Sequence, residues 1–194
     1  MFFRRLGLAI QTPRLILRLP EASDHAAWAR LRTAGNEFLS RWEPVRDADH
    51  LTARAFRSRV AWGQRSVESG RAIPLFLVRR EDKTLLGGIT LDNIRRGPSQ
   101  SASIGYWIGA DYARQGYMTE TVNAVVDYAF KKLDLSRIEA GCLPENAPSR
   151  ALLEKSGFKY EGVAQSYLQI NGRWRNHVLY ANLRWDRRGK TDSG

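Results

Sequence analysis

A glycine-centred turn between an apolar strand and an amphipathic helix is the segment of this 194-residue chain best suited to chemistry. Residues 104–120 read IGYWIGADYARQGYMTE, which predicts a strand, a short polar loop and a helix that begins at Gly116. The first N–H groups of a helix lack partners within it, and the helix dipole adds partial positive charge at the same end. Glycine also lets the backbone come close to a ligand. The segment therefore suits phosphate or pyrophosphate, although an ordinary strand-to-helix turn has the same outline.

Strands and helices alternate around this turn. We expect strands at 12–20, 73–79, 85–94, 101–108, 137–143, 158–170 and 174–185, and helices at 23–33, 51–67, 117–133 and 148–156. Ser23 and Asp24 can cap the first helix, and Gly157 suits the end of the last. Asn171-Gly172 is a preferred tight hairpin turn, whereas 36–49 reads as irregular. These elements predict an α/β fold with a mixed, mostly antiparallel sheet and helices on both faces.

Composition indicates one globular domain. The chain is 43% hydrophobic and 26% charged, and its length suits a single core. We expect an N-terminal extension over 1–11, one domain over 12–186 and a flexible tail over 187–194. The single cysteine, Cys142, lies in an apolar run, which favours a buried residue over a nucleophile and excludes an intramolecular disulfide.

Charge and hydropathy limit the partners. The net charge of +11 favours polyanionic neighbours such as nucleic acid, a ribosome or a phosphorylated cofactor, but a solvated basic surface would look the same. The sequence has no signal-peptide pattern and no apolar run long enough to cross a membrane. We therefore expect a cytoplasmic protein with no membrane partner. No metal-ligand cluster, Ser-His-Asp arrangement or Walker pattern is present, so no metal is expected.

A second motif turns the loop into a family signature. Residues 146–158, NAPSRALLEKSGF, follow the strand, the glycine-turned helix and the next strand, and this combination resembles the GCN5-related N-acetyltransferase (GNAT) superfamily. Residues 38–47, FLSRWEPVRD, and 167–179, YLQINGRWRNHVL, resemble the ribosomal-protein-alanine N-acetyltransferases of the RimJ/RimL type, closest to RimJ. The similarity covers roughly 12–185.

The resemblance implies a GNAT fold whose two central strands splay around acetyl-CoA. It also implies direct acetyl transfer in a ternary complex without an acyl-enzyme. The cofactor-binding residues carried over from the family are Tyr106, Trp107, Ile108, Arg114, Gln115, Gly116, Tyr117, Met118, Thr119, Asn146 and Ser149. One departure concerns the loop signature, which has Arg or Gln three residues before the central glycine and a small residue two after it. Here Ala113 and Met118 occupy those positions, so the prediction depends on backbone N–H groups more than on side chains.

The helix at 148–156 would supply the acid. Many superfamily members place a tyrosine where this chain has Leu153, and that tyrosine protonates the leaving thiolate. Ser149 is the nearest hydroxyl on the same helix face, and it is the candidate acid by family analogy; its other interpretation is a polar residue at a helix start. Asn146 would face the pantetheine and could also cap the helix.

The acceptor side rests on one carboxylate and the last hairpin. A protein α-amino group has a reference pKa of about 7.7–8.0 and lysine about 10.4, so an enzyme without a strong base suits N-terminal amines. His25, His50 and His177 are not placed for that task. Glu43 is the candidate catalytic residue that receives the amine proton, directly or through water. The alternatives are an acid on a surface loop or a salt bridge to Arg41 or Arg46. The expected substrate-binding residues are Trp42, Glu43, Tyr167, Asn171 and Arg175.

The family implies acetylation of the N-terminal alanine of a small-subunit ribosomal protein, so a ribosomal-protein N-terminus is the expected partner, with ribosome association through basic charge. One alternative is acetylation of a small amine such as a polyamine or antibiotic, which a basic chain suits poorly. Another is a non-catalytic ribosome- or RNA-binding protein with the same fold. The oligomeric state, monomer or homodimer, stays open.

Overall fold

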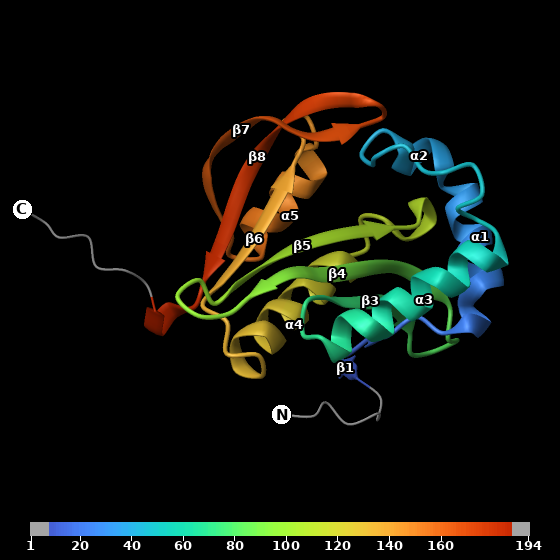
Figure 1. Ribbon diagram of the computed structural model, residues 1–194, viewed down its shortest axis with the longest axis horizontal. Helices are drawn as coiled ribbons and strands as arrows, with labels where there is room; N and C mark the ends of the chain where they lie inside the picture. Colours follow the sequence, from blue (N-terminus) through green and yellow to red (C-terminus); the bar gives the residue numbers. More distant parts are fainter. Residues whose placement is uncertain (1–7, 188–194) are drawn as a thin grey trace, which may run out of the picture.

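The computed structural model describes residues 8–187, which form one eight-stranded sheet flanked by helices (Figure 1). The strands are β1 (Ala9–Gln11), β2 (Leu15–Arg18), β3 (Ile73–Arg79), β4 (Leu85–Arg95), β5 (Ser101–Ile108), β6 (Arg137–Cys142), β7 (Lys159–Ile170) and β8 (Arg173–Leu183). The helices are α1 (His25–Ala34), α2 (Asn36–Ser40), α3 (Ala53–Glu68), α4 (Tyr117–Lys131) and α5 (Ala147–Lys155), with 3₁₀ turns η1 (Ala22–Asp24), η2 (Ala110–Tyr112) and η3 (Trp185–Arg187). The strand order is β1-β2-β3-β4-β5-β6-β8-β7, with only β5 and β6 parallel. The predicted α/β class is confirmed.

The two parallel strands pair over only three residues. Ser101, Ala102 and Ser103 of β5 face Arg137, Ile138 and Glu139 of β6, and beyond that point no pairing joins them. In Figure 1, β6 rises while β5 runs to the right, so the strands open as a V. The β5 backbone from 104 to 108 pairs with β4 on one side only, which leaves the N–H and C=O groups of its other side available to a ligand.

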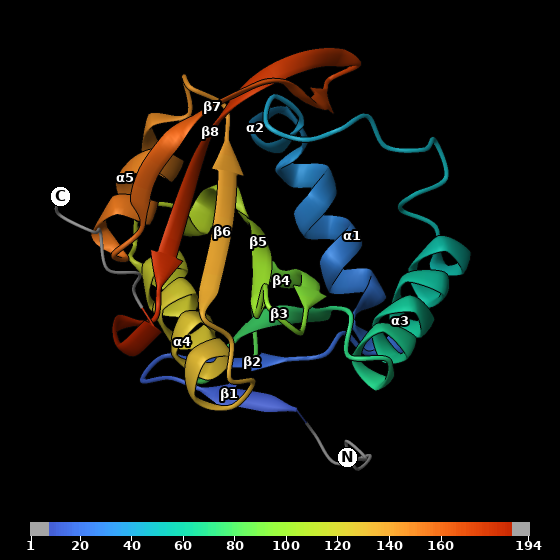
Figure 2. The same ribbon diagram turned by 60° about the vertical axis from the view of Figure 1, so that its left-hand side comes forward.

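Helices cover both faces of the sheet, with α1 and α3 on one side and α4 and α5 on the other (Figure 2). The apolar stripe of α4 lies in the main core through the buried side chains of Met118, Val122, Val125, Val126 and Ala129. Each fully buried side chain of valine size stabilises the fold by about 1.5–3 kcal/mol relative to exposure. This packing fixes α4, and therefore its N-terminal turn, against the sheet.

The opening of the chain differs from the expectation in two ways. The first strand is limited to Leu15–Arg18, and a further strand, Ala9–Gln11, pairs with it antiparallel. Three residues of the expected extension 1–11 thus lie in the sheet, while 1–7 and 188–194 lie outside the described residues. Asp24 precedes α1 but does not cap it, because its carboxylate binds Arg18 and the N–H of Glu21.

The expectation that 36–49 is irregular is wrong for its first part, where Asn36–Ser40 forms α2. The hairpin turn is confirmed: Asn171 and Gly172 have φ of 48° and 75°, as a two-residue turn of this type requires. The turn meets the segment after α2, where the Asn171 N–H donates to the Glu43 carbonyl at 3.1 Å. Within 8–187, no helix is long and apolar enough to cross a membrane.

Candidate functional site

The predicted strand, loop and helix around Gly116 are confirmed. Gly116 is the N-cap of α4 with φ of 80°, and no side chain caps the helix. The first helical bond runs from the Glu120 N–H to the Gly116 carbonyl, so the N–H groups of residues 117–119 have no partner within the helix. Arg114 also has positive φ, at 60°, and successive N–H groups in such turns form anion-binding concavities.

The side chains of this loop divide into two groups. Arg114 and Gln115 are exposed, and the Gln115 amide donates to the Asp111 carbonyl at 2.7 Å. Tyr117 and Met118 are buried in the core. Met118 therefore fits its position because its side chain points away from the loop surface, and only its backbone is available to a ligand. The expectation that backbone N–H groups dominate here agrees with this geometry.

Helix α5 places a hydroxyl pair beside the open V. Asn146 caps the helix through its side-chain oxygen, which accepts from the Ser149 N–H at 3.2 Å. The Ser149 hydroxyl lies 2.8 Å from the Tyr106 hydroxyl, so α5 and β5 are linked. Burial raises the pKa of Tyr106 well above its usual value despite the Ser149 contact. Tyr106 thus stays protonated and can donate a hydrogen bond.

Cys142 at the end of β6 is buried, as expected. Its pKa is raised, chiefly by burial, although the neighbouring Ser149 hydroxyl and Arg150 oppose the shift. A protonated buried thiol is a poor nucleophile, which is consistent with transfer that does not pass through this residue.

Glu43 lies on the opposite face of the sheet in an ion pair. Its carboxylate accepts from Arg32 of α1 at 2.9 Å through one oxygen and from Arg46 at 3.3 Å through the other, which also contacts Arg32. Burial alone would raise the pKa of Glu43, but the hydrogen bonds and charges of the two arginines outweigh it and lower the pKa. The predicted salt bridge to Arg46 is therefore present, and Arg32, which was not predicted, is the main partner.

A cavity of about 460 Å³ adjoins this ion pair. Glu43, Asn171 and His50 line it together with Arg32 and Arg46. The His50 Nδ1 lies 2.8 Å from the Asp47 carbonyl, which can only accept, so Nδ1 donates this hydrogen bond. The sequence did not predict that His50 would line the same cavity as Glu43, because it lies in a loop without periodicity.

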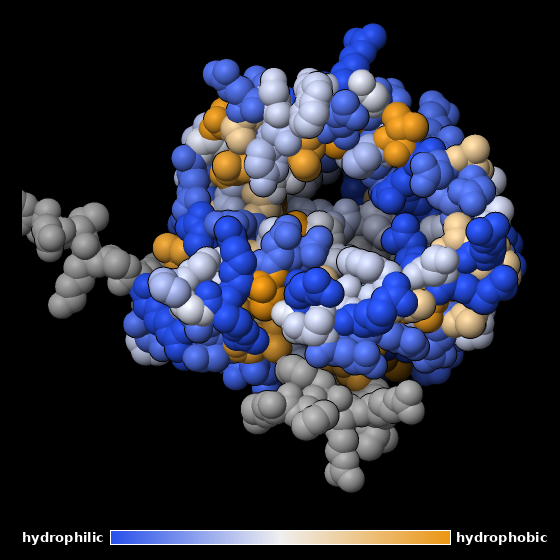
Figure 3. All heavy atoms as spheres, viewed as in Figure 1, coloured by the Kyte–Doolittle hydropathy of each residue, from blue (hydrophilic) through white to orange (hydrophobic). Residues whose placement is uncertain are grey.

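The structure does not bring the other expected substrate-binding residues together in one site. Tyr167 lines a second cavity, of about 690 Å³, between α3 and the hairpin, with Trp62 and Arg65 across it. Arg175 instead pairs with Glu145. Trp42 is half-buried beside Arg41, whose guanidinium lies 6.0 Å from its ring. Figure 3 shows a hollow between the hairpin, α2 and β5 on this face.

Two arginines that the sequence did not single out contact these residues. Arg32 of α1 pairs with Glu43, and its guanidinium carbon also lies 4.9 Å from the centre of the Trp107 ring of β5. Arg14, at the start of β2, donates to the Gln115 carbonyl at 3.0 Å. Arg32 lies four residues after buried Trp28, and that helical spacing is the one signal for it; nothing local links Arg14 to a loop a hundred residues away.

The residues present fit acetyl-CoA. The free N–H groups after Gly116 suit the pyrophosphate, the unpaired edge of β5 suits amide groups of an extended pantetheine, and the Ser149–Tyr106 pair lies beside the same opening. Among residues 8–187, no group of three or more His, Cys, Asp or Glu side chains could hold a metal ion.

Comparison with known proteins agrees with this geometry. Residues 14–159 match the acetyltransferase (GNAT) domain family. The chain is 36% identical to a probable N-acetyltransferase, YjcK, of Bacillus subtilis, over 89% of this chain and 95% of that protein. It is 33% identical to the [ribosomal protein uS5]-alanine N-acetyltransferase of Escherichia coli, over 89% of each.

A solved structure, Mycobacterium smegmatis RimJ in complex with CoA-disulfide, superposes with a TM-score of 0.84 at 33% identity, covering 89% of this chain and 83% of that one. Fold, family match and relatives agree: this chain belongs to the GNAT acetyltransferase family and is an acyltransferase related to the ribosomal-protein-alanine N-acetyltransferases.

Proposed function

We propose that this protein transfers an acetyl group from acetyl-CoA to the α-amino group of the N-terminal alanine of a small-subunit ribosomal protein. The observation that carries the proposal is the open V between β5 and β6. This opening lies between a phosphate-type loop with the Ser149–Tyr106 pair on one face and the Glu43 cavity on the other. The named activity of the 33% identical relative supports the alanine acceptor.

On the donor face, the chain would bind the pyrophosphate through backbone N–H groups of residues 114–119. The free edge of β5 at Tyr106, Trp107 and Ile108 would align the pantetheine amides. When bound, acetyl-CoA supplies the acetyl group as a thioester. Asn146 caps α5 through its oxygen and keeps its amide N–H groups for the donor.

Ser149 would hold a proton at the CoA sulfur. Its hydroxyl shares a hydrogen bond with the Tyr106 hydroxyl, so Tyr106 would orient the Ser149 hydroxyl and stabilise its oxygen when the proton passes to the thiolate. The raised pKa of Tyr106 makes it a hydrogen-bond donor rather than an acid of its own. The distance from the Ser149 Oγ to the sulfur of bound CoA tests this role.

On the acceptor face, Glu43 would orient the amine by accepting a hydrogen bond from it. Alternatively, Glu43 would accept a hydrogen bond from a water molecule that takes the proton of the amine. Its lowered pKa weakens it as a base. The single negative charge of Glu43 is surrounded by three positive charges, on Arg32, Arg46 and Arg59. The pKa of Arg59 is lowered, chiefly by burial and then by the charges of Arg46 and Arg32. This net positive charge disfavours an ammonium ion, so the neutral amine that attacks is favoured at neutral pH.

A peptide assay tests the acceptor. The enzyme, acetyl-CoA and ten-residue peptides beginning with Ala, Ser or Met are incubated, and the acetylated nitrogen is located by fragmentation mass spectrometry. We expect acetylation at the α-amino group, fastest for Ala. A matched peptide with a blocked N-terminus and an internal lysine should stay unmodified.

Acetylation of the lysine side chain alone would contradict the proposal. Turnover of polyamines or antibiotics with no peptide product would favour the small-molecule alternative. The non-catalytic alternative conflicts with membership of an acyltransferase family. The net charge of +11 still supports association with the ribosome, which would appear as co-sedimentation that weakens with salt.

A further inference from the structure

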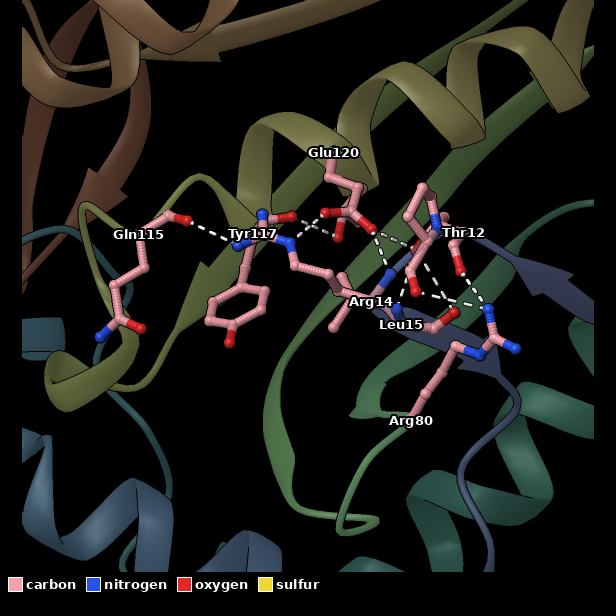
Figure 4. A network of polar contacts seen from close by, with 9 residues as sticks. Thr12, Arg14, Leu15, Arg80, Gln115, Tyr117 and Glu120 are labelled. Carbon is pink, nitrogen blue, oxygen red and sulfur yellow. Dashed lines mark hydrogen bonds and ion pairs between the residues drawn. The ribbon is translucent and has the colours of Figure 1, made fainter.

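Arg14 lies just before β2 and connects it to the loop before α4. The proposed catalytic steps do not use this side chain. Figure 4 shows its guanidinium between Glu120 of α4 and the Gln115 carbonyl. The Arg14 Nε donates to the Glu120 carboxylate at 2.7 Å, and its Nη1 donates to the Gln115 carbonyl at 3.0 Å. The guanidinium carbon lies 4.2 Å from the centre of the Tyr117 ring.

The same side chain lies beside the central glycine. A Cβ added to Gly116 would lie 3.4 Å from the Arg14 Nη2. Arg14 therefore contacts Gln115 and Tyr117 and lies beside Gly116 between them. These are the residues whose backbone turns into α4 with positive φ at its centre.

The partner carboxylate is itself held in place. Glu120 accepts from the Thr12 hydroxyl at 2.6 Å and from the Arg14 backbone N–H at 2.9 Å (Figure 4). Burial would raise the pKa of Glu120, but these hydrogen bonds and the charge of Arg14 lower it. Glu120 is thus ionised and immobile, and the Arg14 fork has a fixed geometry.

We propose that Arg14 is a positioning residue for the CoA pyrophosphate: anchored on Glu120, it holds the Gln115 carbonyl so that the N–H groups after it point at the phosphates. The guanidinium also adds positive charge beside them. Carbonyl groups that turned toward the phosphates would repel them, and Arg14 prevents that rotation at residue 115. The proposal rests on the CoA-binding part of the proposed function.

Calorimetry with CoA and with pantetheine, which lacks the pyrophosphate, isolates this role. Arg14→Gln should weaken CoA binding about tenfold, as loss of a charge-assisted hydrogen bond commonly does. Pantetheine binding should change less than about twofold, since its contacts lie on β5. In turnover, KM for acetyl-CoA should rise while kcat is nearly unchanged. Arg14→Lys keeps the charge but not the fork, and should recover only part of the affinity.

Arg80→Gln is the matched control. Arg80 donates to the Thr12 and Pro13 carbonyls at 3.1 and 3.3 Å, so it supports the same turn without touching the loop (Figure 4). Its loss should leave CoA binding within about twofold of wild type. Glu120→Gln removes the charge that anchors Arg14 but keeps Arg14 itself. It should also weaken CoA binding and leave pantetheine binding nearly unchanged, and it tests the positioning role if Arg14→Gln does not fold.

Equal losses for CoA and pantetheine, or equal losses in the Arg14 and Arg80 variants, would overturn the positioning role. So would unchanged CoA affinity in both Arg14→Gln and Glu120→Gln. Wild-type protein that does not bind CoA at all would contradict the proposed function itself, a different outcome from failure of Arg14 alone.

Discussion

Glu43 shows how a single residue can meet two expectations at once. The sequence made it a candidate proton acceptor or a member of an ion pair, and the structure shows the ion pair. A carboxylate that two arginines keep ionised is a weak base, yet it remains a hydrogen-bond acceptor beside a cavity. In the proposed mechanism, orientation of the amine and the local positive charge do the work that a strong base would do elsewhere.

Glu43→Gln should therefore affect stability as well as turnover. Arg32 is 9% exposed and would lose its counter-charge, so the free energy of unfolding at pH 7 should fall by about 1–3 kcal/mol. Because the folded-state pKa of Glu43 is lowered, its contribution is complete above the ordinary carboxyl pKa and is lost as pH falls through the folded value. Urea denaturation from pH 7 to pH 3 should show the wild-type advantage shrinking at the acid end. Turnover should fall about tenfold if one charged hydrogen bond orients the amine.

Glu37→Gln, in the exposed first turn of α2, is the control and should change stability by less than about 0.5 kcal/mol. Full turnover in Glu43→Gln would remove Glu43 from the mechanism and leave His50 as the next residue to test in the same cavity.

At the scale of elements, local sequence patterns were sufficient to predict a helix or strand where its apolar face or a single turn residue determines it. Strands 73–79 and 101–108 match β3 and β5, and helix α4 begins where Gly116 predicted. Helix α2 was missed because five residues carry too little periodicity. Strand β1 was missed because its three residues gain their stability from pairing with β2.

The same limit applies to the site. The loop, Asn146 and Ser149 follow from motifs, but the contacts of Arg32 with Glu43 and of Arg14 with Glu120 join distant segments. No spacing rule reports such pairs. The position of the hairpin turn against Glu43 likewise arises from the packing of the whole fold.

The turn at α4 gives an element-scale prediction. Gly116→Ala introduces a Cβ at φ of 80°, which should lower the free energy of unfolding by about 1 kcal/mol and weaken CoA binding, because relief of the strained φ would move the N–H groups of the loop. Gly70→Ala is the control, since Gly70 has φ of 67° with open space around it. It should lose similar stability in thermal denaturation and keep its CoA affinity. Equal CoA affinity in both variants would contradict a rigid loop.

At the scale of the molecule, the proposed mechanism assigns the donor and the acceptor to opposite faces of the sheet. Helices α4 and α5 would frame the donor face, α1 to α3 and the hairpin would frame the acceptor face, and the V between β5 and β6 would connect the two (Figures 1 and 2). This division would follow from the short pairing of β5 with β6, the only parallel pair among the described strands. A strand pair that closed along its full length would leave no passage for the thioester.

A crystal structure of the CoA complex tests this central claim most directly. We expect the pyrophosphate within hydrogen-bond distance of the N–H groups of residues 114–119, and the pantetheine between β5 and β6. The sulfur should lie about 3–4 Å from the Ser149 Oγ, with the Glu43 cavity reached from it through the V. A pyrophosphate bound away from this loop, or a pantetheine lying outside the V, would contradict the account.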